Sequence, residues 1–259
     1  MNRTQQLCAI VMPAYNEAGC IRGVCEEWIG VLAQLGDGRL IVVNDGSTDE
    51  TGFILDRLAE QFSQICVVHQ ENVGHGAAIR RGYATALELG CGWVFQVDSD
   101  RQFEAGEMLK VWALRDSFEF LLGVRSERKD PLLRRLLSKG HRLLVTLFFG
   151  VRVSDPNTPF RLMRSDLLEI LLELIPEEAF APNVFLSILA AGCGCRFKEV
   201  PVRHLPRVSG CGSIGIRRLP SLVLRCAAEL IRFRTKFRAA DRRLREELKT
   251  CGEFRQRSL

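Results

Sequence analysis

The sequence predicts an α/β protein with a mostly parallel central sheet flanked by helices. In the first hundred residues, short apolar runs rich in Val and Ile alternate with longer segments of helical periodicity. Strands that alternate with helices form βαβ units and parallel sheets. Polar clusters follow the apolar runs, at the strand ends where parallel sheets bind ligands. The composition, 47% hydrophobic and 26% charged over 259 residues, is typical of globular proteins.

The predicted elements follow from these periods in chain order. Four buried strands are expected at Cys8–Met12, Leu40–Val43, Ile65–Val68 and Trp93–Val97. Helices are expected between them, at Glu17–Leu35, Asp49–Phe62 and Ala77–Leu89. The second half adds helices at Glu104–Arg115, Asp166–Leu174 and Ala179–Ala191, and strands at Phe120–Val124 and Arg196–Val202. We therefore expect one domain over residues 1–215.

Two amphipathic segments complete the chain. Pro131–Phe149 places leucines on one face and basic residues on the other, and the tail from Leu219 is again helical in pattern. Residues 216–259 are therefore predicted to form a basic amphipathic helical extension. These faces fit either a membrane interface or the protein's own core, and we expect contact with a membrane surface.

The charge distribution narrows the classes of partner. The net charge is +5, but residues 217–257 alone carry 13 Lys and Arg against 5 Asp and Glu. Such a tail suits a membrane surface, a nucleic acid or an acidic protein. Nucleic acid is not expected, because Phe233 and Phe237 offer no stacking platform on a sheet.

The sequence also favours a location inside the cell. No apolar run approaches the roughly 20 residues of a membrane span, and Met1–Leu7 does not resemble a signal peptide. The ten cysteines are scattered, as expected of reduced thiols. We expect a cytoplasmic protein, peripheral at the cytoplasmic face of a membrane.

Four polar clusters follow the first four predicted strands and are expected at one edge of the sheet. They are Pro13-Ala14-Tyr15-Asn16-Glu17, Asn44-Asp45-Gly46-Ser47-Thr48, Glu71–Ala77 and Asp98-Ser99-Asp100-Arg101-Gln102. The cluster around Asn44 fits a strand-to-helix turn, in which Asp45 is placed to accept hydrogen bonds from a base or ribose. Gly74 and Gly76 suit close backbone packing rather than a dinucleotide motif, because Ile79 replaces the third glycine.

Asp98 and Asp100 are the candidate metal ligands. Their i, i+2 spacing directs both carboxylates to one side of an extended strand. Hard divalent cations are held by one or two carboxylates, with substrate phosphates completing the shell. A lone Asp-x-Asp is more often a solvated turn. Together with the other three clusters, it predicts a Mg²⁺ or Mn²⁺ site for a nucleoside diphosphate.

These motifs, in this order, resemble those of the family 2 glycosyltransferases of the GT-A fold. The resemblance runs through the first 125 residues. The later motifs are similar to those of the polyprenyl-phosphate branch, which includes dolichol-phosphate mannosyltransferase. They are Gly123-x-Arg125, the stretch around Ser138 and His141, Asp155-x-x-x-Pro159-Phe160-Arg161 and Arg207-x-x-Gly210. The chain lacks the lysine that the branch places after Arg207, a role for which Arg217 or Arg218 is the alternative.

The resemblance implies a GT-A glycosyltransferase domain and inverting sugar transfer from a UDP- or GDP-sugar. It implies that the nucleoside is bordered by Pro13, Tyr15, Glu17, Val43 and Asp45. It implies that metal and diphosphate are held by Asp98, Ser99, Asp100 and Gln102. Arg125 and Arg207 are expected to neutralise phosphate on the donor or the acceptor.

The acceptor decides whether a general base is needed. A phosphate monoester is largely dianionic at pH 7, so a polyprenyl phosphate needs none. A sugar hydroxyl in glycan synthesis needs a base, for which Asp155 is the candidate. Asp155 fits an Asx-turn before Pro156 equally well. A nucleotide-sugar sensor or scaffold without turnover is the non-enzymatic alternative.

Overall fold

Seven strands form one mixed sheet in the computed structural model, which describes residues 7–126, 145–177, 179, 181–205, 228–229, 231–234 and 237. The strands lie in the order β3-β2-β1-β4-β6-β5-β7. They are β1 (Cys8–Ala14), β2 (Gly38–Asp45), β3 (Ile65–Gln70), β4 (Trp93–Gln96), β5 (Phe120–Ser126), β6 (Arg161–Arg164) and β7 (Phe197–Arg203). The helices are α1 (Ile21–Leu35), α2 (Thr51–Gln61), α3 (His75–Glu88), α4 (Glu107–Trp112), α6 (Ser165–Leu174) and α7 (Pro182–Gly192).

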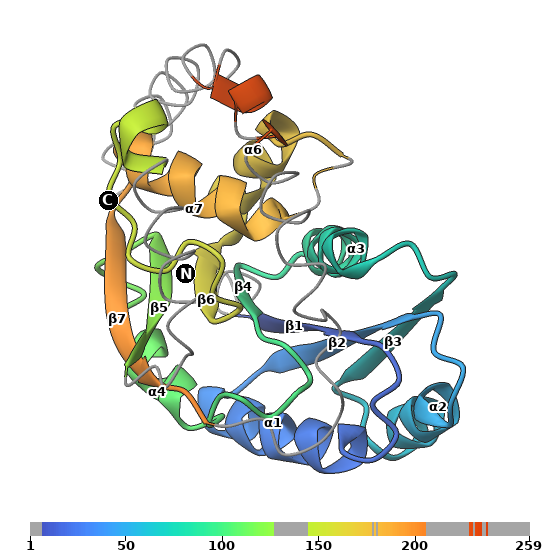
Figure 1. Ribbon diagram of the computed structural model, residues 1–259. Coiled ribbons are helices and arrows are strands. Elements are labelled where there is room, and N and C mark those ends of the chain that lie inside the picture. The colour runs from blue at the N-terminus through green and yellow to red at the C-terminus, as the bar shows by residue number, and fades with distance from the viewer. Residues whose placement is uncertain are drawn as a thin grey trace.

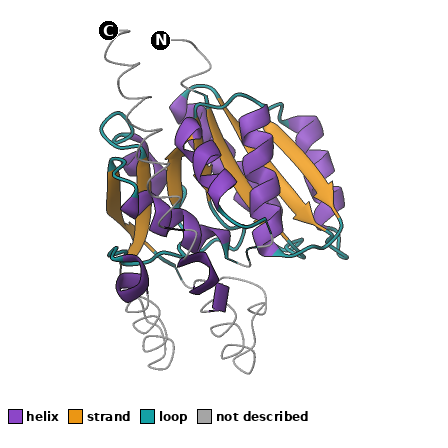
Figure 2. Cartoon of the chain, turned by 90° about the horizontal axis from the view of Figure 1, so that it is seen from above, coloured by secondary structure: helices purple, strands orange, loops and turns teal. Residues whose placement is uncertain are grey.

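Helices cover both faces of the sheet (Figures 1 and 2). Successive strand residues point to opposite faces, so β1 sends Cys8, Ile10 and Met12 into one core and Ala9 and Val11 into the other. The first core also takes residues from α1, α2 and α4. The second takes residues from α3, α6 and α7. Strands buried on both faces explain the continuous apolar runs in the sequence.

Strand directions bring six strand ends and one strand start to the same edge of the sheet. β1 pairs in parallel with β2 and β4, and β2 with β3. β6 runs antiparallel to both β4 and β5, and β5 pairs in parallel with β7. The carboxyl ends of β1, β2, β3, β4, β5 and β7 therefore share an edge with the beginning of β6. In the register, Gln96 at the end of β4 lies opposite Arg161 at the start of β6.

Most predicted elements are confirmed, with shifted ends. The first helix begins at Ile21 instead of Glu17, because residues 15–20 form a loop in which Cys20 and Ile21 donate backbone hydrogen bonds to the Glu17 carbonyl. The helix expected from Ala179 begins at Pro182. The helix expected at Glu104–Arg115 spans only Glu107–Trp112. Strand β6 was not predicted, since its four residues have arginine at both ends.

Several predicted features fall outside the described residues. These are positions 131–144 of the first amphipathic segment, the domain boundary at 215 and most of the tail. Within the described part, residues 145–149 and the described residues from 228 to 237 are helical. Among the described residues, no helix is long and apolar enough to cross a membrane.

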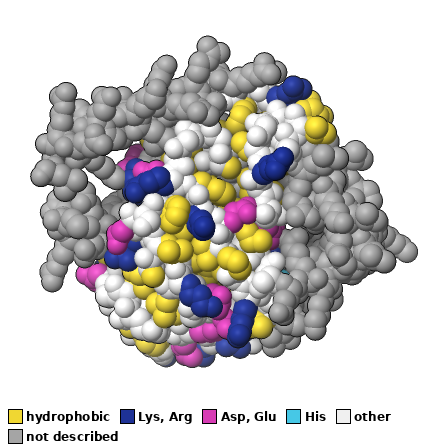
Figure 3. Space-filling view, turned by 90° about the vertical axis from the view of Figure 1, so that its left-hand side faces the viewer, with side chains coloured by type: hydrophobic (Ala, Val, Ile, Leu, Met, Phe, Trp, Pro, Cys, Tyr) yellow, Lys and Arg dark blue, Asp and Glu magenta, His cyan; other side chains and the backbone are white. Residues whose placement is uncertain are grey.

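Strand β7 forms one edge of the sheet and carries features that discourage pairing with another chain. Lys198, Pro201 and Arg203 are exposed on it. Charge and proline are common protections of edge strands. The surface on this side of the molecule mixes basic, acidic and hydrophobic side chains, as Figure 3 shows.

Candidate functional site

The loops that follow β1 and β2 are tied together by hydrogen bonds. The Asn16 backbone N–H donates to Ser47 Oγ at 3.0 Å, and the Thr48 N–H donates to Asn16 Oδ1 at 2.8 Å. Asn16 adopts a positive φ of 54°, which asparagine tolerates better than most residues. The Glu17 N–H donates to Thr51 Oγ1 at 2.8 Å, at the start of α2. Two of the four predicted clusters therefore form one connected structure.

Asp45 fixes the loop that precedes α3. Its Oδ1 accepts hydrogen bonds from Gln70 Nε2 at 2.7 Å and the Val73 N–H at 3.1 Å. Its Oδ2 accepts one from the Gly74 N–H at 3.0 Å. Gly74 has a φ of 98°, a backbone conformation that glycine adopts without strain. The carboxylate predicted to face the nucleoside thus also organises the third polar cluster.

The other predicted nucleoside residues lie along the same edge. Pro13 and Val43 are neighbours in the β1–β2 register and are buried, so they belong to the sheet that supports the edge. Tyr15 follows with 47% of its surface exposed. Glu17 is partly buried, and its Oε2 lies 3.2 Å from Cys20 Sγ.

Asp98 and Asp100 follow β4 at the centre of this edge. Asp98 Oδ1 accepts a hydrogen bond from Gln96 Nε2 at 3.3 Å and lies 3.6 Å from His75 Nε2. Asp100 is 8% exposed, and its Oδ1 accepts from the Gln102 N–H at 3.2 Å. Ser99 between them is buried, and its carbonyl contacts Cys20 Sγ. The structure therefore brings the predicted metal and diphosphate residues together.

The aspartate pair carries unbalanced negative charge. Burial raises the pKa of Asp98 above its ordinary value, and the neighbouring Asp100 adds to the shift. The neighbouring His75, Arg161 and Arg125 side chains oppose the rise in this pKa without cancelling it. A divalent cation would relieve this charge.

These residues fit a metal that is shared with a substrate. Among the described residues, no three His, Cys, Asp or Glu side chains are grouped so as to hold a metal ion. Mg²⁺ is commonly held by one or two carboxylates while substrate phosphates and water complete its shell. Asp98 and Asp100 match that donor set.

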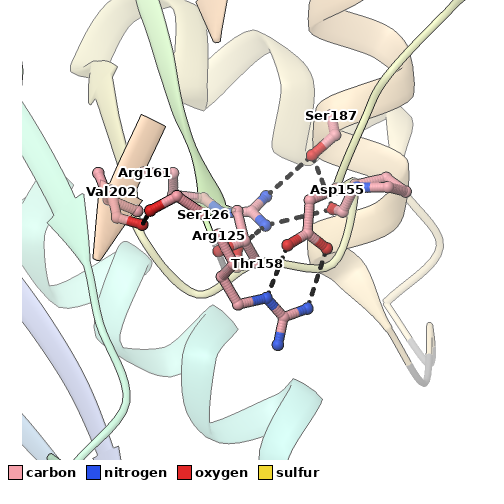
Figure 4. Close-up of polar contacts among 8 residues, drawn as sticks. Arg125, Ser126, Asp155, Thr158, Arg161, Ser187 and Val202 are labelled. Carbon is pink, nitrogen blue, oxygen red and sulfur yellow. Dashed lines mark hydrogen bonds and ion pairs between the residues drawn. The ribbon is translucent and has the colours of Figure 1, made fainter. Parts of the chain in front are cut away.

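Arg125 and Asp155 form a two-pronged ion pair (Figure 4), and Arg125 is near enough to Asp98 to lower the pKa of that carboxyl. Arg125 Nε donates to Asp155 Oδ2 at 2.6 Å and Nη2 donates to Oδ1 at 2.9 Å. The Asp155 side chain is 7% exposed and that of Arg125 is 24% exposed. Two residues that the sequence marked separately are therefore one unit, at the end of β5 and before β6.

A buried cation, Arg161, supports the loop that carries Asp155. Its guanidinium is fully buried and donates to the carbonyls of Pro156, Thr158 and Asn183. It also donates to Ser187 Oγ at 3.4 Å. Burial lowers the pKa of Arg161, and the nearby Tyr83, Asp155 and Asp98 oppose that shift. The sequence motif contained Arg161, but the sequence analysis gave it no role.

One predicted site residue, Arg207, lies outside the described residues. The remaining ones gather at the carboxyl edge of β1, β2, β4 and β5. That edge, with an aspartate pair beside a paired arginine, is the arrangement of a nucleotide-dependent α/β enzyme. Residues 9–171, more than half of the chain, match the sequence model of the family described as Glycosyl transferase family 2. The chain belongs to this family, as the sequence motifs predicted.

Curated relatives agree with the predicted branch of the family. The undecaprenyl-phosphate 4-deoxy-4-formamido-L-arabinose transferase of Edwardsiella ictaluri is 26% identical over 225 residues, which are 85% of this chain and 67% of the relative. The enzyme of the same name from Pseudomonas fluorescens is 28% identical, over 83% of this chain and 62% of the relative. The chain thus spans about two thirds of the length of these relatives.

Solved structures confirm the GT-A fold. Glucosyl-3-phosphoglycerate synthase from Mycobacterium tuberculosis, in complex with Mn²⁺, UDP-glucose and phosphoglyceric acid, superposes with a TM-score of 0.67 at 18% identity. The match covers 89% of this chain and 80% of the synthase. The same synthase with Mg²⁺ and UDP also gives a TM-score of 0.67 at 18% identity, over 88% of this chain and 79% of the synthase. At this identity the likeness concerns the fold.

Proposed function

We propose that this protein transfers a sugar, with inversion at the anomeric carbon, from a UDP- or GDP-sugar to a polyprenyl phosphate. The observation that carries the proposal is the Asp98–Asp100 pair beside the Arg125–Asp155 ion pair at one sheet edge. Family membership supports the reaction class, and the names of the curated relatives support a polyprenyl-phosphate acceptor.

In the proposed reaction, an acceptor phosphate oxygen attacks the anomeric carbon of the donor sugar. The bond from that carbon to the diphosphate oxygen breaks, and the nucleoside diphosphate leaves with the electron pair. Asp98 and Asp100 would hold Mg²⁺ or Mn²⁺, which supplies Lewis-acid stabilisation of the leaving diphosphate. Pro13, Tyr15, Glu17, Val43 and Asp45 would border the nucleoside. Ser99 and Gln102 shape the loop that carries the aspartates.

The Arg125–Asp155 pair favours a phosphate acceptor over a sugar hydroxyl. A carboxylate held by two charge-assisted hydrogen bonds is stabilised in its ionised form and is a weak base. Dianionic phosphate needs no base. Asp155 then orients Arg125, whose guanidinium offers preorganised positive charge to a phosphate. Arg207 is proposed to add to that charge.

A lipid acceptor requires access to a membrane surface. Among the described residues, Leu147 is 68% exposed and Ile231 is 53% exposed. They lie in two segments that contact each other, since Phe149 packs on Phe233 and the Arg234 guanidinium lies 5.3 Å from the Phe148 ring centroid. Exposed apolar side chains beside arginines suit an anionic membrane interface. We propose peripheral binding at the cytoplasmic face.

The test supplies the purified chain with labelled UDP- or GDP-sugars, Mn²⁺, and either polyprenyl phosphate or a sugar alcohol. Label is expected in the lipid phosphate. Asp100→Ala is expected to lower the rate by about 10²–10³-fold, because charge stabilisation of the leaving group is lost. Asp116→Ala, which removes a 75% exposed carboxylate that precedes the start of β5, at the end of that strand opposite Arg125, serves as the matched control.

Three outcomes would contradict the proposal. Label in the sugar alcohol alone would assign glycan synthesis with Asp155 as base. Donor binding without turnover would indicate a nucleotide-sugar sensor. Full activity of Asp100→Ala at saturating Mn²⁺ would remove the metal assignment.

A further inference from the structure

A chain of buried polar side chains ends on Asp98. Tyr83 Oη, from α3, donates to Asn183 Oδ1 at 3.3 Å. Asn183 Nδ2, from α7, donates to Gln96 Oε1 at 3.1 Å. Gln96 Nε2, at the end of β4, donates to Asp98 Oδ1 at 3.3 Å. Tyr83 and Gln96 are fully buried and Asn183 is 3% exposed, so solvent does not replace these bonds.

Asp98 at one end and Tyr83 at the other determine which group donates and which accepts in each of these hydrogen bonds. An ionised carboxylate only accepts hydrogen bonds, so Gln96 must turn its NH₂ group toward Asp98 and its carbonyl toward Asn183. Asn183 must then present its own NH₂ group to Gln96 and its carbonyl to Tyr83. Burial raises the pKa of Tyr83 further above its usual value, so its hydroxyl remains a donor. The Tyr83 hydroxyl, the Asn183 amide and the Gln96 amide therefore all donate in the direction of Asp98.

This series of hydrogen bonds ends on one oxygen of Asp98. Gln96 is the last residue of β4 and Asp98 follows two positions later, where its carboxylate meets the Gln96 amide. The contacts of Asp98 with Gln96 and His75 both involve Oδ1. Within the described part of the chain, Oδ2 has no hydrogen-bond partner. Holding Oδ1 restricts the rotation of the carboxylate and leaves Oδ2 as the oxygen that a cation could bind.

Asn183 also connects this chain to the loop of Asp155. Its backbone carbonyl accepts hydrogen bonds from Arg161 Nη1 at 2.8 Å and Ser187 Oγ at 3.0 Å. Arg161 in turn holds the carbonyls of Pro156 and Thr158, which follow Asp155. Substituting the Asn183 side chain removes the branch toward Asp98 and keeps the carbonyl that anchors the other branch.

We propose that Gln96 and Asn183, oriented by Tyr83, are positioning residues that aim the Asp98 carboxylate at the divalent cation of the donor complex. The inference rests on the proposed function, since it requires a cation at Asp98. Hydrogen bonds to a ligating carboxylate typically change metal affinity by about 10–100-fold when removed. The residues thus contribute to metal affinity without touching the metal.

The experiment measures Mn²⁺ binding to the full-length chain in the presence of UDP or GDP, by calorimetry and by the electron paramagnetic resonance of free Mn²⁺. Gln96→Met keeps the length of the side chain and removes its hydrogen bonds. Its Mn²⁺ dissociation constant is expected to rise about 10-fold or more. Nucleotide binding without metal is expected to stay within about twofold, because the nucleoside contacts are elsewhere.

Two further variants separate positioning from general destabilisation. Asn183→Leu is expected to weaken Mn²⁺ binding in the same way, and the double variant is expected to lose little more, because either change breaks one chain. Thr85→Val is the matched control: it removes a hydrogen bond from the largely buried Thr85 to the Arg81 carbonyl in α3, outside the chain of dipoles. Its Mn²⁺ affinity is expected to equal that of the wild type.

The outcomes distinguish the inference from the proposed function. If the wild type binds no Mn²⁺ with either nucleotide, the metal assignment and the inference both fail. If the wild type binds Mn²⁺ and Gln96→Met binds it equally well, the inference alone is wrong. The inference would also be wrong if Gln96→Met lost as much affinity for the nucleotide without metal as it lost for Mn²⁺. Should Gln96→Met not fold, Tyr83→Phe is expected to weaken Mn²⁺ binding by a smaller factor, and unchanged affinity would contradict the inference.

Discussion

At the scale of single residues, Arg161 shows how a buried charge is accommodated. A guanidinium loses its hydration when it is buried, which costs several kcal/mol unless polar groups replace the water. Three carbonyls and the Ser187 hydroxyl provide that replacement. The bonds run from β6 to the loop before it and to α7, so a single side chain joins three segments.

Arg161→Met is therefore expected to destabilise the fold. The change removes the Arg161 donor from the Thr158 carbonyl and leaves the carbonyls of Pro156 and Asn183 with the Ser187 hydroxyl, and each unsatisfied buried group costs about 1–3 kcal/mol. Since 1 kcal/mol corresponds to about 2–4 °C in Tm for a chain of this size, a loss of several degrees is expected in calorimetry. Arg57→Met, which removes a solvent-exposed pair with Glu60, is the control and should change Tm very little. Equal Tm values for both variants would show that Arg161 is not structurally important.

At the scale of elements, the connection from β2 to α2 holds the loop after β1 in place. Asp49 Oδ1 accepts hydrogen bonds from the backbone N–H and the hydroxyl of Thr51, and Oδ2 accepts one from the Ala18 N–H at 3.2 Å. Slight burial raises the pKa of Asp49, but these bonds outweigh it and the pKa lies below its ordinary value. The ionised carboxylate therefore stabilises the start of α2 and the loop of residues 15–20.

Asp49→Ala is expected to lower the free energy of unfolding by about 1 kcal/mol at pH 7, an amount limited by the exposure of the group to solvent. Because the pKa is depressed in the folded state, the contribution is complete above the unfolded pKa of about 4 and is lost as the pH falls from there through the lower folded-state pKa. Urea unfolding between pH 7 and pH 3 should show the gap between wild type and variant closing at acid pH. Asp37→Ala, an exposed carboxylate outside these contacts, is the comparison. A gap that persists at pH 3 would contradict the assignment.

At the scale of the whole molecule, the mostly parallel sheet and the gathering of the polar clusters at one of its edges were predictable from the sequence, whereas the strand order was not. The strands around Ile10, Val42 and Val94 are strong local signals because both of their faces are buried. Polar clusters at strand ends then follow from the parallel topology. The missed features depend on distant partners: Tyr83 meets Asn183 across 100 residues, and Gln96 meets it across 87. The local pattern of apolar and polar residues does not predict contacts between residues so far apart in the sequence.

The same reasoning explains the pairing of Arg125 with Asp155. Arg125 was expected to neutralise a phosphate, and Asp155 was expected either as a base for a hydroxyl acceptor or as an Asx-turn residue. Their pairing was not predicted, because the two residues are 30 positions apart in the sequence. Strand β6, which was missed, begins at the edge where β5 ends, so the loop before it places Asp155 beside Arg125. An unpredicted strand of four residues therefore decides which of the predicted residues act jointly.

The position of β1 and β4 inside the sheet has a consequence for how the molecule opens. Both strands have hydrogen-bonded neighbours on each side and helices on each face, whereas β3 and β7 are edges. Amide protons of β1 and β4 are therefore expected to exchange with deuterium only on global unfolding, while those of β3 and β7 exchange through local openings. Mass spectrometry of deuterated peptides would show this order, and faster exchange in β1 than in β3 would contradict it. The aspartates that follow β4 are thus attached to a strand that is expected to stay intact until the whole protein unfolds. The edge strands β3 and β7 are expected to open and close many times before that happens.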